Sequence, residues 1–345
     1  IMEWAQASLG ASEADSYHYA FAVACVSLIV SIAIYYLTNG TYKHVLATED
    51  KAAKGEGKTV AAAPELSKEE TKERIVCLCL VFAVVIFFWM AFHQNGSALT
   101  FFAKNYTDLC VTGPMRLGFN IWILALIALS VYTLFSTFQS ETKKGKILSG
   151  IFTLLIWGAA ALIFFFVTPD PVNAQPSDFQ QFNPFFVVAL TPVSMAIFAA
   201  LAKKGKEPSA PKKIALGMLV AALGFVIITL ASFGLTSPKD LNGTTQSILS
   251  PGWLISTYLT LTFAELLLSP MGISFVSKVA PPKYKGMMMG CWFAATAIGN
   301  YLSSIPSMLW NRIPLMANWG ILIALCLIAA VIMFALMKKI EAATN

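Results

Sequence analysis

Long apolar runs separated by short polar segments dominate the hydrophobic pattern of this chain. A membrane-spanning helix needs about 20 mostly apolar residues, because it crosses about 30 Å of hydrocarbon at 1.5 Å per residue. The runs that approach or exceed this length cover residues 19–37, 75–103, 117–138, 147–167, 182–201, 214–235, 253–279, 287–310 and 319–337. The pattern therefore predicts an all-α membrane protein with nine transmembrane helices.

The composition supports the same class. Hydrophobic residues make up 57% of the chain, charged residues make up 12%, and the mean hydropathy is +0.69. A soluble domain carries about a quarter charged residues, so the composition excludes an ordinary soluble domain.

Basic residues predict the orientation of the helices. If the segment after the first span is cytoplasmic, twenty of the 24 Lys and Arg residues lie inside. The four that lie outside are Lys104, Arg116, Lys239 and Arg312. This asymmetry predicts a multi-pass protein of the inner (cytoplasmic) membrane, with the lipid bilayer as its surroundings. The net charge of +6 thus follows from topology and implies no nucleic-acid partner.

One long polar segment divides the chain. Residues 39–74 lack apolar periodicity and are rich in Lys, Glu, Ala and Gly, which is typical of a cytoplasmic linker. Residues 1–38 then form one membrane segment and residues 75–345 another, with a lipid-facing hairpin at about 117–167. The start of the chain is predicted outside without an export signal, so we expect upstream helices of the same polypeptide as partners.

A carboxylate lies within the apolar run 253–279. At helical spacing, Glu265 shares one polar face with Tyr258, Thr262, Ser269 and Gly272. An ionisable group at membrane depth costs roughly 2.5 to 3.5 kcal/mol in insertion measurements, so it usually lines a water-filled cavity or a proton path. This face is the first candidate for function.

Other chemistry is sparse. Five of the six cysteines fall in apolar runs and Cys110 is the only one in an outside loop, so the sequence predicts no disulfide framework. Cys77 and Cys79 lack metal-ligand spacing, and the three histidines are scattered. We expect neither a metal nor a cofactor.

Several segments resemble the proton-dependent oligopeptide transporters of the major facilitator superfamily. The most specific is Phe-Ala-Glu-Leu-Leu-Leu-Ser-Pro-Met-Gly at 263–272, followed by similar stretches at 278–293 and 297–301. Residues 88–97 are similar to the family's seventh helix, and 182–192 to its eighth. The resemblance implies a major-facilitator-type bundle, in which 1–38 is the last helix of the N-terminal half and 75–345 is the C-terminal six-helix bundle with an inserted hairpin.

The sequence departs from the family in three ways. The family's first-helix motif, Glu-x-x-Glu-Arg-Phe-x-Tyr-Tyr, is not in this sequence, and the extra helical pair follows the seventh helix instead of the sixth. His93 occupies a position where the seventh-helix motif usually has Glu. With an ordinary pKa of about 6.5, a histidine could titrate there, or it could be a packed core residue.

The resemblance also implies site residues. Glu265 would bind the substrate amino group and couple protons, alone or with His93. The other substrate-binding candidates are Asn183, Trp89, Gln94, Trp292 and Ser269. Pro270 and Gly272 would form a kink used in gating. Structural alternatives remain for several of them: a buried paired carboxylate for Glu265, a helix N-cap for Asn183, core packing for the two tryptophans, and a plain helix kink for residues 269–272.

The implied function is proton-coupled symport of di- and tripeptides by alternating access, with small peptides and protons as partners. A carrier of the same fold for nitrate, an amino acid or a drug would keep these helices and change the cavity. A non-transporting membrane subunit or sensor would make Glu265 purely structural. An enzyme is disfavoured, since no nucleophile and base pair, metal cluster or phosphate-binding loop is evident.

Overall fold

The computed structural model describes residues 2–38, 40 and 66–342, which are helical apart from loops and one two-stranded sheet. The chain divides into two units, Ile1–Glu65 and Leu66–Asn345. Most of the predicted linker 39–74 lies outside the described residues. Its last part, from Lys68 to Arg74, forms the beginning of helix α4.

The first unit contains α1 (Met2–Leu9) and α2 (Glu13–Leu37). Ser12 caps α2, because its Oγ accepts a hydrogen bond of 3.1 Å from the backbone N–H of Asp15. Gln6 Nε2 donates to Ser16 Oγ at 3.1 Å and joins the two helices. Exposed apolar side chains such as Leu28 and Ile29 surround α2, as expected of a helix that lies in lipid or against other helices.

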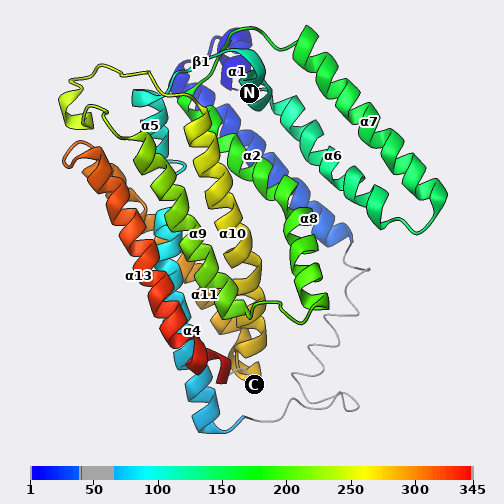
Figure 1. Cartoon of the computed structure of the whole chain (residues 1–345), viewed down its shortest axis with the longest axis vertical. Helices are drawn as coiled ribbons and strands as arrows, with labels where there is room; N and C mark the ends of the chain where they lie inside the picture. Colours follow the sequence, from blue (N-terminus) through cyan, green and yellow to red (C-terminus); the bar gives the residue numbers. More distant parts are fainter. Residues whose placement is uncertain (1, 39, 41–65, 343–345) are drawn as a thin grey trace. The chain divides into compact units, whose positions relative to one another are not determined.

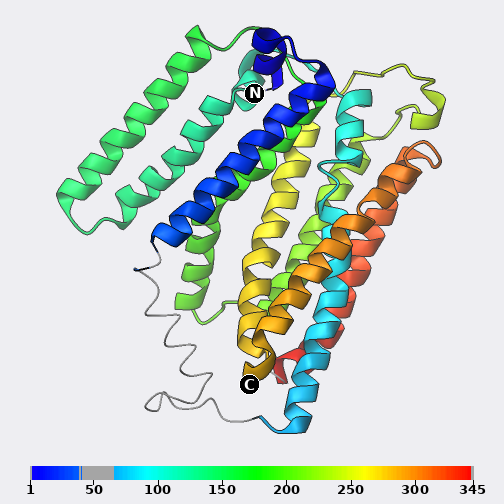
Figure 2. The same ribbon diagram turned by 180° about the vertical axis from the view of Figure 1, so that it is seen from behind.

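The second unit is a helical bundle (Figures 1 and 2). Its long helices are α4 (Lys68–Phe92), α6 (Ile121–Gln139), α7 (Lys143–Phe166), α8 (Phe182–Lys203), α9 (Ala210–Ala231), α10 (Gly252–Val279), α11 (Lys285–Leu302) and α13 (Leu315–Ala342). The shorter elements are α5 (Ala98–Tyr106), α12 (Ser304–Leu309), β1 (Cys110–Val111), β2 (Val172–Asn173) and the 3₁₀ turns Gly113–Phe119, Pro176–Gln181, Pro238–Asp240 and Pro282–Tyr284.

Five long helices close a ring around one apolar core. Helix α9 packs against both α10 and α13, α4 packs against both α11 and α13, and α10 contacts α11. Phe88, Phe225 and Trp319 are fully buried in this core, and Trp319 Nε1 donates to Ser232 Oγ at 3.0 Å. Helix α8 lies beside α10, and the α6–α7 hairpin reaches the bundle through α8 (Figure 1).

The loops at the start and end of the hairpin are tied together. Strands β1 and β2 pair antiparallel, with Cys110 opposite Asn173. Arg116 forms an ion pair with Asp170 at 3.2 Å and donates to the carbonyls of Thr168 and Pro169. These contacts fix the base of the hairpin.

The predicted count of nine membrane spans is too high for the described residues, eight of whose helices are long and apolar enough to cross a membrane. The predicted span 287–310 divides at Ser303 into α11 and the six-residue α12. The span 75–103 divides in the same way, because residues 93–97 form turns between α4 and α5. Helix α6 begins four residues later than predicted, at Ile121, where Asn120 Oδ1 accepts from the first backbone N–H groups.

Candidate functional site

Glu265 lies near the middle of the 28-residue helix α10 and faces α8. Its Oε2 accepts a hydrogen bond of 3.1 Å from Nδ2 of Asn183. The same Nδ2 donates to Oγ1 of Thr262 at 3.1 Å, one turn earlier on α10, and Thr262 is fully buried. The structure thus brings together two residues predicted for the site, Glu265 and Asn183, with a third polar residue between them.

The Glu265 carboxylate has no cationic partner within the part of the chain that the structure describes. None of the ion pairs there includes it, and its Oε1 accepts no hydrogen bond from those residues. The side chain is only half-buried. One oxygen is therefore held in place while the other is available to an ammonium group or a proton.

The beginning of α8 positions Asn183. The helix starts at Phe182, and Pro184 fits in the first turn because backbone N–H groups there have no partner within the helix. The residue at the N-cap position is Gln181, so Asn183 is inside the helix and does not cap it. Its amide is thereby directed across to α10.

Gly272 and Trp292 form a close crossing between α10 and α11. The Trp292 side chain is only 2% exposed, and its ring meets Phe82 edge-on at 6.2 Å between centroids. A Cβ on Gly272 would lie 2.0 Å from Cη2 of Trp292, far inside van der Waals contact. The indole therefore occupies the space that any larger residue at 272 would need.

Trp89 takes part in a second close crossing, between α4 and α11. A Cβ on Gly299 would lie 2.5 Å from Cβ of Trp89 and 2.6 Å from the carbonyl oxygen of Ile86. Trp89 is 7% exposed, and its buried Nε1 has no hydrogen-bond partner among the described residues. His93 lies one turn further, with Nδ1 3.2 Å from the Trp89 carbonyl oxygen and the two rings 5.1 Å apart. Both rings belong to one aromatic cluster at the end of α4.

Gln94 occupies a separate junction, where the break between α4 and α5 meets the break between α11 and α12. Its Nε2 donates to the carbonyls of Met90 at 2.8 Å and Ser303 at 3.1 Å, and its Oε1 accepts from Ser97 Oγ at 3.0 Å. Gln94 is fully buried. Tyr258 OH donates to the Asn95 carbonyl at 3.2 Å and connects α10 to the same break. The whole Gln94 amide is engaged in this arrangement.

Ser269 and Pro270 lie one to two turns beyond Glu265 on α10. Helix α10 continues through Pro270, which is exposed, while Ser269 is half-buried. Proline has no N–H, so the carbonyl of Leu266 lacks its usual helical donor. Helix α10 therefore lacks one backbone hydrogen bond at this position.

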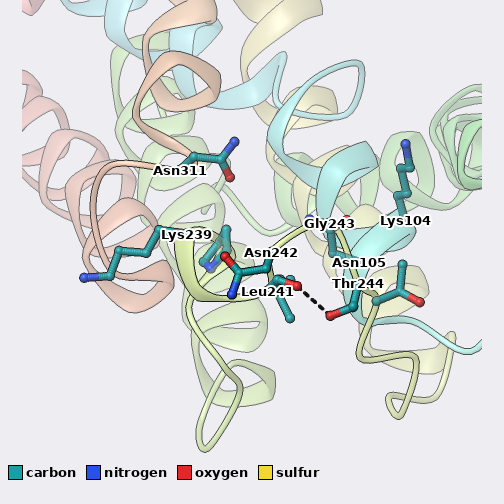
Figure 3. A pocket seen from close by; sticks show the side chains of 10 residues that line it. Lys104, Asn105, Lys239, Leu241, Asn242, Gly243, Thr244 and Asn311 are labelled. Carbon is teal, nitrogen blue, oxygen red and sulfur yellow. Dashed lines mark hydrogen bonds between the residues drawn. The ribbon is translucent and has the colours of Figure 1, made fainter.

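A surface pocket of about 430 Å³ lies at the end of the bundle that is predicted to face outside (Figure 3). Lys104, Lys239, Asn242 and Asn311 are among its lining residues. The two lysine side chains extend away from one another, with Asn242 between them (Figure 3). They do not converge on a common ligand position.

Sequence reasoning missed two polar contacts. The Gln94–Ser303 junction lies within runs that are apolar enough to be taken as single helices, although Asn95-Gly96 and Pro306 are breaking signals. Lys213 was predicted as an inside-loop lysine, but it is in α9 with its side chain 4% exposed. It pairs with Glu207, and its ammonium lies 4.2 Å from the centre of the Phe198 ring.

Comparison with known proteins gives one consistent family. The family model described as "POT family" matches residues 168–333. Peptide transporter YePEPT of Yersinia enterocolitica subsp. palearctica is 27% identical over 241 residues, which cover 70% of this chain and 34% of that protein. Dipeptide and tripeptide permease B of Xenorhabdus bovienii is 28% identical over 221 residues, which cover 64% of this chain and 37% of that protein.

Solved structures share the fold. The crystal structure of peptide transporter POT in complex with sulfate matches with a TM-score of 0.54 at 21% identity, covering 97% of this chain and 55% of that one. The chain thus spans about half of this structure, and its matched parts cover little more than a third of the two curated relatives.

Proposed function

Because the chain belongs to the POT family, we propose that it supplies the C-terminal half of a proton-coupled symporter of di- and tripeptides. It is a multi-pass membrane protein of a transporter family and not an enzyme. The names of its relatives, a peptide transporter and a dipeptide and tripeptide permease, support peptides as the substrate class. Transporters of this fold bind substrate near the bilayer midplane, between two halves that move against one another.

The observation that carries the proposal is the Glu265 carboxylate. Asn183 fixes one of its oxygens at 3.1 Å, and the described residues leave the other without a partner. In this proposal Glu265 binds both the peptide amino group and the coupled proton. Because a carboxylate cannot bind both at full strength, the binding of one affects the binding of the other. Asn183 orients the carboxylate through its Nδ2, and its amide oxygen Oδ1 is left to accept a hydrogen bond from the substrate.

The remaining residues have supporting roles in this proposal. Trp89 and Trp292 shape apolar side-chain pockets, and the Trp89 indole N–H has a hydrogen bond left to donate. The Gln94 side chain can reach the substrate only if its hydrogen bond to Ser303 breaks, so its first role is to hold the two helix breaks together. Ser269 extends the polar face of α10. Pro270 and Gly272 make α10 deformable at the crossing with α11, which suits a gate.

His93 is proposed as a second titrating group. It is next to the Trp89 carbonyl and lies in the turn after α4, where a change of charge would act on the helix break. Protonation there creates a cation, whereas protonation of the glutamate that is usual in the family removes an anion.

Uptake into proteoliposomes tests the proposal, with the chain in its full-length transporter. Under an inward proton gradient, Glu265→Gln should abolish or strongly reduce accumulation of labelled di- and tripeptides, because it keeps the shape and removes the charge and the titration. Glu141→Gln, in the exposed turn of the hairpin, is the matched control and should accumulate peptide normally. His93→Gln should shift the pH profile of uptake.

Normal accumulation by Glu265→Gln at every pH would refute this assignment. Counterflow with labelled nitrate, amino acids or drugs, but not with peptides, would instead identify a different solute carrier of the same fold. No exchange of any solute by the wild type would favour a non-transporting subunit.

A further inference from the structure

Two neighbouring pockets lie between α6 and α8 and share Tyr132. The first has a volume of about 410 Å³ and the second about 510 Å³. Residues of α6 line one side from Ile121 to Gln139, and residues of α8 line the other from Pro184 to Ala199. Together they form a groove, here called the α6–α8 groove, along the full length of α6.

Two hydroxyl contacts of α6 are made with α7 and not across this groove. Thr133 accepts from Thr153 at 2.8 Å, and Ser136 and Ser149 are 3.1 Å apart, so these contacts join α6 to α7. The face of α6 toward α8 is apolar over its first half and reaches α8 through one hydrogen bond, from Tyr132 OH to the Val188 carbonyl at 3.0 Å. The helices are thus tied at one point, with space on either side of it.

The two ends of the groove differ in chemistry. The first pocket is lined by apolar side chains apart from Tyr132 and Gln181. The second has Ser136, Gln139 and Ser140 at the end that is predicted to face the cytoplasm.

The segments just beyond that polar end are basic. The first turn of α7 carries Lys143, Lys144 and Lys146, all exposed, and the turn before it has one glutamate, Glu141. Lys203, Lys204 and Lys206 are exposed at the corresponding end of α8. An apolar channel that ends in hydroxyl and amide groups beside net positive charge is complementary to an anionic amphiphile.

We propose that the α6–α8 groove binds an anionic glycerophospholipid of the cytoplasmic leaflet. Gln139 and Ser140 hydrogen-bond its glycerol and phosphate oxygens, and Lys143, Lys144 and Lys146 neutralise its charge. One acyl chain lies along Pro192 and Met195 and continues past Tyr132 into the apolar pocket. The lipid would fill the space between the hairpin and the bundle.

Lipid retention by the purified full-length transporter tests this proposal without any transport measurement. Native mass spectrometry with phosphatidylglycerol and phosphatidylcholine should show preferential retention of phosphatidylglycerol. The triple variant Lys143→Gln, Lys144→Gln, Lys146→Gln should weaken that binding by on the order of a hundredfold, since each lysine near an anionic surface contributes a factor of about five. Ala196→Trp, which fills the second pocket, should displace the lipid while the lysines stay in place.

Two matched controls define the outcome. The triple variant Lys212→Gln, Lys283→Gln, Lys285→Gln removes three exposed charges from the same predicted face, at positions that do not line the groove. Ala161→Trp adds bulk to an exposed position of α7. Both controls should retain phosphatidylglycerol as the wild type does. Equal retention of the two lipids by the wild type, or equal losses in the control and test variants, would overturn the proposal.

Discussion

The crossing of α10 and α11 gives a quantitative test of the packing at the candidate site. Replacing Gly272 with Ala places a Cβ 2.0, 2.4 and 2.8 Å from three ring atoms of Trp292. Ordinary carbon contacts are about 3.5 to 4.0 Å, so the helices or the indole must move by more than about 1 Å. The indole has little room to do so, because it is 2% exposed and packs against Phe82.

Two opposing terms set the expected size of the effect. Overpacking a filled core costs about 1–3 kcal/mol, while Ala gains about 0.5–1 kcal/mol over Gly within a helix. The net loss for Gly272→Ala is therefore about 1–2 kcal/mol, or a fall of roughly 2–6 °C in apparent Tm for a domain of this size. Gly290→Ala, on α11 with no atom within 4 Å of its new Cβ, should leave the apparent Tm unchanged or slightly raised.

Thermal unfolding in detergent, with the folded fraction followed by size-exclusion chromatography, measures both variants. A double-mutant cycle identifies the cause, since Trp292→Phe removes the part of the indole that Gly272 contacts. In that background, Gly272→Ala should cost little. The reasoning would be refuted if Gly272→Ala were as stable as Gly290→Ala, or if its cost were the same with Phe at position 292.

Other polar residues of the second unit test its buried ion pair, its helix junction and its predicted topology. Glu207→Gln should lower the free energy of unfolding more than Lys213→Met. The change at Glu207 leaves the Lys213 ammonium, which is 4% exposed, without its carboxylate, whereas the change at Lys213 leaves a carboxylate that is 41% exposed. Equal losses of stability in denaturation assays would contradict this. Gln94→Leu should cost about 2–3 kcal/mol by leaving buried partners unsatisfied. Asn95→Ala should cost under about 1 kcal/mol, because among the described residues its side chain accepts one hydrogen bond, from the backbone of Gly96. A loss of peptide affinity in Gln94→Leu with unchanged stability would point to direct substrate binding instead. Cysteines introduced at Lys206 and Asn242 should be labelled by impermeant maleimide from opposite sides, cytoplasmic and external respectively, and labelling from one side would overturn the predicted topology.

The helices could be predicted from the sequence because lipid leaves few alternatives for an apolar run. The end of α10 at Val279 and the start of α8 at Phe182 are where the pattern predicts them. The interruptions after Phe92 and at Ser303 could not be located, because hydropathy continues through them and the backbone groups are satisfied by distant partners such as Gln94 and Tyr258.

The polar face of α10 was predictable, but its partners were not. Periodicity places Thr262 and Glu265 together, and the family resemblance adds Asn183 as a candidate. Neither the periodicity nor the resemblance indicates that Nδ2 of Asn183 donates to both of these side chains. The burial of Lys213 was not predictable, because a lysine at the edge of a span usually faces water. Here Glu207 and the Phe198 ring stabilise its ammonium among the helices.

The junction between the two helix breaks has a consequence for sequence variation. Gln94 donates to the main-chain carbonyl of Ser303, and Tyr258 donates to the main-chain carbonyl of Asn95. Any residue that keeps the backbone path at 303 and 95 supplies the same acceptor, whereas the donors at 94 and 258 need specific side chains. Homologous chains should therefore vary freely at one end of each contact and little at the other, so that the two positions do not covary. Methods that infer contacts from paired substitutions would miss the connection that joins three helices of this bundle.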